Sequence, residues 1–157
     1  MLMKTDPSTK VDRMRTDSRL SRMLHVLLHM ARHDRPLTSE EIGGMLSTNA
    51  AVVRRTMAGL RKAGYVRSEK GHRGGWTIAC DLSKVTLLDI HKAVGGPRIF
   101  AMGIDNEHPE CGVERVVNDS LKGVFQQAET LLISQLQAVS LADLASDFNT
   151  LCTNKAK

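Results

Sequence analysis

Aromatic residues are scarce in this chain, at 3% of 157 residues, so Leu, Val, Met and Ala must fill its core. The apolar fraction of 41% is sufficient for one domain, or for one domain with an added dimerisation helix. No stretch approaches the roughly 18 consecutive apolar residues of a membrane span. The N-terminus also lacks the apolar core of a signal peptide, and we therefore expect a cytoplasmic protein without a membrane partner.

Cysteine is scarce as well. Cys80, Cys111 and Cys152 are too few and too far apart for the disulfide framework of a small secreted protein. Catalytic signatures are also missing, because no nucleophile–base pair, phosphate-binding loop or complete set of metal ligands can be assembled from neighbouring motifs. The sequence thus gives no support to an enzyme.

Positive charge is concentrated in the first half of the chain. Residues 1–80 contain 15 Lys and Arg against 7 Asp and Glu, a balance of +8. Residues 81–157 contain 7 against 10, a balance of −3. This asymmetry indicates that only the first half meets a polyanion such as nucleic acid.

Residues 38–64 carry the pattern of two short helices joined by a turn. Thr38 and Glu41 form a capping box at the start of a helix predicted over residues 38–46. After the turn at 47–49, capped by Thr48 or Asn49, a second helix is predicted to stop at Gly64. Its inner face is apolar and consists of Val53, Met57 and Leu60. Its outer face is basic and consists of Arg54, Arg55, Arg61 and Lys62.

Two short strand-like runs follow, at residues 65–68 and 76–79. The glycine-rich basic turn between them, residues 69–75, predicts a hairpin. Two helices and a basic hairpin in this order predict a winged helix-turn-helix, in which the second helix enters the major groove of DNA and the wing lies on neighbouring phosphates or in the minor groove. The alternative is a small helical domain with a solvated basic face.

The segments before residue 38 are less distinctive. Residues 1–17 are polar and aperiodic, and we interpret them as a disordered leader or a basic arm. A helix is predicted from Ser18 to about His33, with an apolar face made of Leu20, Met23, Leu24, Leu27, Leu28 and Ala31. His25, His29 and His33 have the spacing of helical metal ligands, but no carboxylate or cysteine partner is near in sequence. We therefore favour a polar stripe and expect no metal site.

The second half of the chain predicts helices of a different kind. Thr86 and Asp89 form a capping box for a short helix that ends at residues 95–97. After an irregular loop, an amphipathic pattern runs from Val113 to Val139, a helix about 40 Å long. Such a helix is longer than this domain can cover alone, so pairing with its copy in a dimer is one interpretation. A break at Gly123 into two helices is the other.

These elements predict a fold that is mostly α with a small β-hairpin wing: a winged helix-turn-helix domain plus a long dimerisation helix. A last short helix follows a third capping box, Ser140 with Asp143, and runs to about Leu151. The expected division is a leader at 1–17, the DNA-binding domain at 18–97, an effector loop and dimerisation helices at 98–151, and a tail at 152–157.

Six stretches together resemble the Rrf2 family of winged-helix transcriptional regulators. They are Ser18–Leu20, Asn49–Arg55, Leu60–Gly64, Gly71–Trp76, Leu87–Val94 and Pro109–Cys111, and the resemblance spans roughly residues 18–150. It implies a homodimer whose long helices cross at the interface and whose two winged domains bind double-stranded operator DNA. It also implies that Asn49 and Ala51 stand at the groove-facing start of the recognition helix.

Cluster-binding members of that family carry three closely spaced cysteines before the long helix, where this chain has Cys111 alone. Since an iron–sulfur cluster needs about four ligands, mostly thiolates, the chain resembles the cluster-free branch and we expect no cofactor. Cys111 then has three interpretations: an inert buried residue, a reactive thiol at a helix N-terminus, or a metal ligand. Its acidic neighbours Glu107, Glu110 and Glu114 argue against the reactive thiol, because negative charge disfavours a thiolate.

Side-chain chemistry assigns the DNA contacts. Arg54 is the leading candidate for reading a base, because arginine pairs bidentately with guanine O6 and N7. The other residues of the predicted DNA-binding site are expected at phosphates or in the wing turn: Thr38, Ser39, Arg55, Lys70, His72 and Arg73. The predicted function is thus a sequence-specific DNA-binding regulator, a dimeric repressor that responds to redox or to a ligand. The alternative is a winged-helix protein-interaction or accessory module that binds no DNA.

The dimer interface is predicted on the apolar face of the long helix, at Leu121, Val124, Ala128, Leu131 and Leu132. Cys111 and Cys152 are candidate redox thiols. If the crossing helices bring Cys111 of one subunit to Cys152 of its partner, a disulfide would fix the angle between the two DNA-binding domains.

Overall fold

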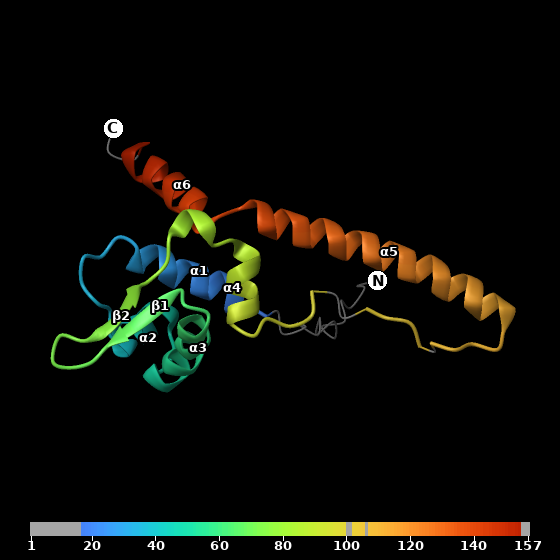
Figure 1. Cartoon of the computed structure of the whole chain (residues 1–157), viewed down its shortest axis with the longest axis horizontal. Coiled ribbons are helices and arrows are strands. Elements are labelled where there is room, and N and C mark those ends of the chain that lie inside the picture. The colour runs from blue at the N-terminus through green and yellow to red at the C-terminus, as the bar shows by residue number, and fades with distance from the viewer. Residues whose placement is uncertain (1–16, 100–101, 106, 155–157) are drawn as a thin grey trace, which may run out of the picture.

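Helices dominate the computed structural model, which describes residues 17–99, 102–105 and 107–154 (Figure 1). Most of the predicted leader and the last residues of the predicted tail therefore lie outside the described residues. The elements are α1 (Arg19–Met30), α2 (Ser39–Leu46), α3 (Ala50–Lys62), β1 (Val66–Glu69), β2 (Gly75–Ile78), the 3₁₀ turn η1 (Leu82–Lys84), α4 (Leu87–Ala93), α5 (Gly112–Ala138) and α6 (Leu141–Asn154). The predicted class, mostly α with a β-hairpin wing, is confirmed.

The helix-turn-helix forms as its capping residues predict. Thr38 Oγ1 accepts a hydrogen bond from the Glu41 amide, and the Glu41 carboxylate accepts one from the Thr38 amide. Asn49, one of two predicted caps, accepts from the Val52 amide at the start of α3. Between the helices Ser47 adopts a left-handed conformation with φ of 50°, which closes the turn. These local bonds set where both helices begin.

The wing is a two-stranded antiparallel hairpin in which Val66 pairs with Ile78 and Glu69 with Gly75. Its strands begin and end within one residue of the predicted runs. Leu37 forms an additional antiparallel bridge to Trp76, so the segment before α2 lies along β2. This bridge attaches the wing to the helix-turn-helix.

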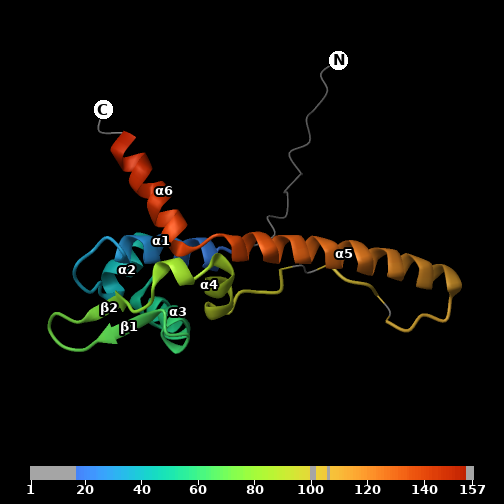
Figure 2. The same ribbon diagram turned by 45° about the horizontal axis from the view of Figure 1, so that its top comes forward.

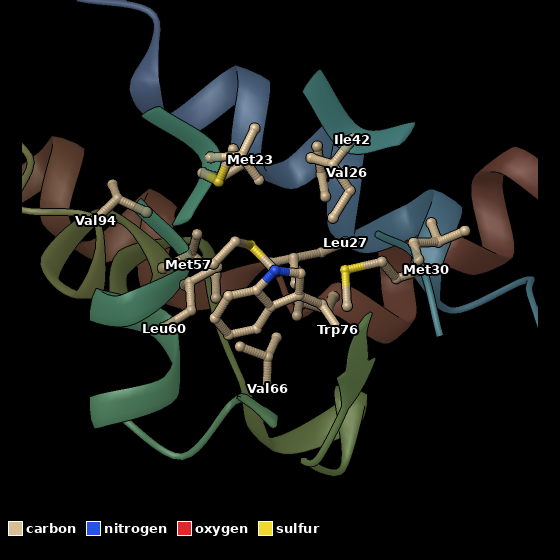
Figure 3. Close-up of a cluster of buried hydrophobic side chains, with 14 of the residues drawn as sticks. Met23, Val26, Leu27, Met30, Ile42, Met57, Leu60, Val66, Trp76 and Val94 are labelled. Atoms are coloured by element: carbon tan, nitrogen blue, oxygen red, sulfur yellow. The ribbon is translucent and has the colours of Figure 1, made fainter. Parts of the chain in front are cut away.

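The core is aliphatic, with Trp76 among the side chains at its centre (Figure 3). Trp76 is buried and its indole Nε1 donates to the Ser39 hydroxyl at 3.0 Å. The most deeply buried side chains come from every part of the winged domain: Val26, Leu27, Leu37, Ile42, Val53, Met57, Leu60, Val66, Ile90 and Leu141. Core volume is thus supplied by Leu, Val, Ile and Met, as the shortage of aromatics requires.

Helix α1 is shorter than predicted and presents a slightly different face. It ends at Met30 instead of His33, because the Arg32 and His33 amides turn back to carbonyls three residues earlier. Val26 and Met30 are buried, whereas Ala31 is exposed. The predicted inclusion of Ala31 in the core-facing stripe was therefore wrong.

The connection between α5 and α6 belongs to the winged domain. The Leu87 amide donates to the Val139 carbonyl, and the Leu141 amide donates to the Val85 carbonyl. Leu141 is 1% exposed, and α6 packs on η1 and α1. A boundary at residue 97 consequently separates two parts of the sequence that share one core.

Helix α5 is a single helix of 27 residues that runs through Gly123, so the alternative of two helices broken there was wrong. It extends away from the winged domain, and the described residues of the preceding loop, 98–99, 102–105 and 107–111, lie along it toward its N-terminal end (Figure 2). Its main neighbour among the described elements is α4. None of the described helices is long and apolar enough to cross a membrane.

Candidate nucleic-acid interface

The recognition helix α3 has the two faces that its sequence predicts. Val53, Met57 and Leu60 are each at most 1% exposed and anchor the helix in the core. Ala51, Arg54 and Arg55 point outward and are exposed, together with Arg61 and Lys62 at the C-terminal end. Asn49 is exposed at the N-terminal end, where its side-chain oxygen is used as a cap while its amide NH₂ stays available to donate. One side of α3 thus carries donors and positive charge.

Arg54 forms an ion pair with α2. Its Nη1 atom lies 3.6 Å from Oε1 of Glu40, with side-chain exposures of 58% for Arg54 and 71% for Glu40. Arg61, about two turns further on, donates to the Ser68 hydroxyl of β1 at 3.4 Å. Arg54 therefore connects the recognition helix to the start of α2, and Arg61 connects it to the wing.

Ser39 does not sit where a phosphate contact requires it. Its side chain is 8% exposed and its hydroxyl accepts the hydrogen bond of the Trp76 indole. The predicted phosphate contact through this hydroxyl was therefore wrong, because sequence alone did not show that the indole needs an acceptor there. Thr38, next to it, is half-buried; its oxygen caps α2 and its hydroxyl hydrogen can still be donated.

A cleft between the wing and the start of α2 brings three predicted residues together. It is lined by Thr38, His72 and Arg73, and also by Arg35, Glu41 and Gly74. Lys70 is exposed in the same hairpin turn. The cleft thus carries the guanidinium groups of Arg35 and Arg73 beside the N-terminal end of α2, together with the carboxylates of Asp34 and Glu41.

Arg35 is a residue of this cleft that the sequence pattern did not single out. Its guanidinium forms a two-point ion pair with Glu41, with contacts of 2.6 and 3.2 Å. This hydrogen bond, followed by that of the Thr38 amide, lowers the pKa of Glu41 to about 2. The signal in the sequence was an arginine six residues before the acid of a capping box, a spacing that becomes informative only when the intervening loop folds back.

Cys111 is exposed at the N-terminal end of α5, so the single chain does not bury it as the first interpretation required. The backbone N–H groups of Glu114 and Val113 lower the pKa of its thiol, although the neutral thiol makes no capping hydrogen bond. The expected opposing effect of the acidic neighbours does not prevail, because hydrogen bonds from the helix-end amides favour the thiolate and outweigh burial, which raises the pKa.

The other two cysteines have different surroundings. Cys80, just after β2, is half-buried, and burial, followed by the charge of Asp81, raises the pKa of its thiol. Cys152 is exposed on α6, where Nη1 of Arg32 lies 3.8 Å from its sulfur. Cys111 lies just before α5, and Cys152 lies in the last turn of α6. The length of α5 alone, about 40 Å, separates them. They cannot meet within one chain.

The five residues predicted for dimerisation lie on one side of α5. Leu121, Val124, Leu131 and Leu132 are 37–63% exposed, and Ala128 between them is half-buried. Their spacing of three and four residues makes a continuous apolar stripe, and Val113 and Val117 extend it toward Cys111. This stripe is not covered by any other described part of the chain.

The histidines of α1 do not form a complete metal site. Nε2 of His25 lies 3.0 Å from Nε2 of His29, and His33 lies beyond the end of the helix. Burial, followed by the charges of His25, His33 and Arg32, lowers the pKa of His29. Among the residues that the structure describes, no three His, Cys, Asp or Glu side chains are grouped as metal ligands.

Residues 16–147 match the Rrf2 family, described as an iron-dependent transcriptional regulator. YwnA of Bacillus subtilis (strain 168), whose name places it among HTH-type transcriptional regulators, is 28% identical over 82% of this chain and 95% of its own. CymR of B. subtilis, titled its global cysteine regulator, has a similar structure, with a TM-score of 0.64 at 20% identity over 84% of this chain and 96% of CymR. IscR of T. potens has a TM-score of 0.62 at 19% identity over 86% and 88%.

Proposed function

Because the chain belongs to the Rrf2 family of transcriptional regulators that bind DNA, we propose that it represses transcription as a homodimer bound to a two-fold symmetric operator. Such a dimer works in the cytoplasm, where its DNA lies, and catalyses no reaction. The observation that carries this proposal is that exposed cations lie both on α3, at Arg54 and Arg55, and in the wing turn, at Lys70 and Arg73. The Arg54–Glu40 contact links α3 to the first turn of α2, and the cleft at Thr38 links that turn to Arg73.

Each part of this surface has its own role at DNA. Arg54, with Asn49 and Ala51 near the start of α3, is exposed and in this proposal meets base edges in the major groove. Arg55 and the wing residues Lys70 and His72 contact phosphates, as do the donors around the cleft at Arg73. Base contacts then determine sequence preference, and phosphate contacts determine affinity.

Binding to the chain's own upstream DNA and to a random duplex, measured by gel shift across a salt series, tests this assignment. Arg54→Ala should weaken operator binding by about 1–3 kcal/mol and relax the preference at one base position. Arg73→Ala should weaken binding to both duplexes alike and lower the salt slope by about one. An equal loss on both duplexes for Arg54→Ala would contradict base reading by Arg54.

The same experiment separates the second candidate function, a winged-helix protein-interaction module. Such a module needs no exposed set of cations on α3 and the wing, and its affinity for any duplex would be low and unaffected by Arg54→Ala or Arg73→Ala. A protein-binding role is therefore indicated if neither duplex is bound at low salt.

Dimerisation is supported by the uncovered apolar stripe of α5. Leu131, at 63% exposure, is a large aliphatic side chain facing solvent in the monomer. Burying such a side chain against a copy contributes about 1.5–3 kcal/mol. Two winged domains held by paired α5 helices would then meet two half-sites of a palindrome.

We propose also that this regulator operates without an iron–sulfur cluster. The iron dependence in the family's description requires a ligand set, and the loop before α5 offers one thiol, Cys111. About four ligands, mostly thiolates, hold such clusters, so the donor set present does not fit one. Protein purified without oxygen should show no absorbance band between 300 and 500 nm. A band in that range, lost on exposure to air, would refute the proposal.

We propose that the regulator responds to a redox signal, because one of its exposed thiols has the properties of a reactive cysteine. Cys111 is exposed with a lowered pKa, so a larger fraction of it is the reactive thiolate. Its oxidation with Cys152 of a partner subunit would form one disulfide, releasing two protons and giving two electrons to peroxide, which becomes water. The α carbons must come within about 7 Å for that bond.

Peroxide treatment followed by electrophoresis without reductant tests the switch. A dimer band should form in the wild type and be absent from both Cys111→Ser and Cys152→Ser, and operator affinity should change only when the band forms. Unchanged mobility and affinity would contradict the redox response and leave DNA binding itself unaffected.

A further inference from the structure

Two carboxylates stand in the first turn of α2, and they have different surroundings. Glu41 is used in the capping box and in the ion pair with Arg35. Glu40 points to the other side, toward the recognition helix, where Arg54 is its partner at 3.6 Å. With 71% of its side chain exposed, Glu40 lies on the surface that we assign to DNA.

A negative side chain in that position is unfavourable for DNA binding in general. DNA is a dense polyanion, and a carboxylate beside its phosphates is repelled. An exposed ion pair contributes little to the stability of the fold, and an acid in the first turn of a helix adds only about 0.3–1 kcal/mol, so stability accounts for Glu40 only in small part. Within the described residues, Arg55 on the same face of α3 has no carboxylate partner.

The guanidinium geometry suggests what Glu40 does. Arginine has five N–H donors in a planar fork, so two can bond guanine O6 and N7 while another still faces a carboxylate. A guanine contact by Arg54 is thus compatible with the Glu40 pair. A phosphate contact is less favourable, because it brings a second anion next to the Glu40 carboxylate at the same guanidinium, whereas the guanine edge is uncharged.

We propose that Glu40 is a specificity-determining residue, which orients Arg54 toward the base edges and penalises complexes in which Arg54 binds a phosphate. The inference rests on the DNA contact proposed above for Arg54. Glu40 contacts Arg54 and no base, so it affects the preference for a DNA sequence only through the position of Arg54. Its effect falls mainly on non-operator DNA, where phosphate contacts supply nearly all of the affinity.

Anisotropy titrations of fluorescent duplexes test the proposal with four proteins: wild type, Glu40→Gln, Arg54→Ala and the double variant. The two duplexes are one selected by the wild type from a randomised library and one of random sequence. Glu40→Gln should tighten binding to the random duplex and reduce the ratio of the two affinities roughly tenfold, the scale of one lost base preference. In the Arg54→Ala background, Glu40→Gln should leave that ratio unchanged.

Asp147→Asn is the matched control, because it removes one negative charge from an exposed position on α6 and leaves α2 and α3 intact. It should leave the ratio of affinities as in the wild type. Repeating the selection with Glu40→Gln should relax the base position that Arg54→Ala relaxes. The midpoint of thermal unfolding should be the same in Glu40→Gln as in the wild type, which a merely structural role would not give.

Two results would overturn the inference. The first is that Glu40→Gln changes both affinities by the same factor, as a general charge effect does. The second is that the base preference relaxed by Glu40→Gln differs from the one relaxed by Arg54→Ala. If Arg54→Ala itself has no effect on the selected duplex, the DNA contact of Arg54 fails, and that outcome is distinct from a failure of Glu40 alone.

Discussion

Thr38 and Ser39 are adjacent hydroxyl residues at the start of α2, and the fold gives them different tasks. Thr38 caps the helix at the edge of the wing cleft, whereas Ser39 supplies the acceptor for the buried indole of Trp76. Neighbouring residues of one helix point in directions about 100° apart, so their burial can differ completely. At the scale of the residue, the role of each of these two hydroxyl groups therefore depends on the direction in which its side chain points, more than on the residue type.

Ser39→Ala should lower the free energy of unfolding by about 1–3 kcal/mol, because the Trp76 N–H is then buried without an acceptor. Urea denaturation measures this loss, and Ser68→Ala on the exposed face of β1 serves as the control, with a change within about 0.5 kcal/mol. The salt slope of DNA binding should not change in Ser39→Ala. A lower salt slope of DNA binding with unchanged stability would show instead that the Ser39 hydroxyl contacts a phosphate.

His29 makes stability depend on pH. Burial, followed by the charges of His25, His33 and Arg32, holds the pKa of His29 below the value of about 6.5 that histidine has in an unfolded chain. Below that pH the unfolded state binds the proton more readily, so stability is fully present above about pH 6.5 and is lost as the pH falls. Urea unfolding at pH 7.5 and 5.5 should show a smaller difference in His29→Gln than in the wild type. Equal differences would contradict the assignment to His29.

At the scale of the element, the two glycines of α2 show how closely the helix-turn-helix is built. The Gly43 carbonyl accepts from the Thr48 amide at 2.9 Å, and a methyl group at Gly43 would lie 2.7 Å from the Thr48 carbonyl oxygen. A methyl group at Gly44 would meet nothing within 4 Å. Of the two adjacent glycines, Gly43 is therefore required by the turn, whereas Gly44 is open to substitution.

Gly43→Ala should destabilise the domain by about 1–3 kcal/mol through this overpacking and should weaken DNA binding, because the turn orients α3. Gly44→Ala should be neutral or stabilising by up to about 1 kcal/mol, because alanine is the better helix former. Thermal unfolding and duplex binding of the two variants, measured side by side, check both outcomes. A similar effect of both substitutions would contradict the close contact at Gly43.

At the scale of the whole molecule, α5 extends away from the winged domain (Figures 1 and 2). The large apolar side chains of its stripe are exposed in the single chain. A helix about 40 Å long has far more surface than α4 covers. A large uncovered apolar surface is typical of interaction sites. We therefore expect α5 to be stabilised mainly by burying this stripe against a second subunit.

Leu131→Glu should convert the dimer to a monomer by placing a charge in the apolar stripe, and should weaken binding to a palindromic duplex. Light scattering at micromolar concentration measures the mass. Thr130→Glu places the same charge on an exposed position away from the stripe and should leave the dimer intact. A wild-type protein that is already monomeric, or equal masses for the two variants, would refute dimerisation through this face.

The sequence by itself determined the helices and the wing, because their signals are local. Three capping boxes, the glycine after α3 and the alternating faces of α3 depend on residues within a few positions of each other. The basic face of α3 followed directly, since Val53, Met57 and Leu60 had to point inward. For the same reason the helical periodicity alone placed Arg54 on the outward face, where a base contact is possible.

Only the tertiary structure decided how distant residues share a site. The Trp76 indole, which donates a hydrogen bond to the Ser39 hydroxyl, is 37 residues away from it in sequence. Leu141 belongs to a core whose other buried members all precede residue 95. The pairing of Glu40 with Arg54 and the cleft between Arg35 and Arg73 depend on how α2 meets α3 and the wing. Contacts of this kind arise from packing between elements, and no periodicity along the chain encodes which side chains will meet.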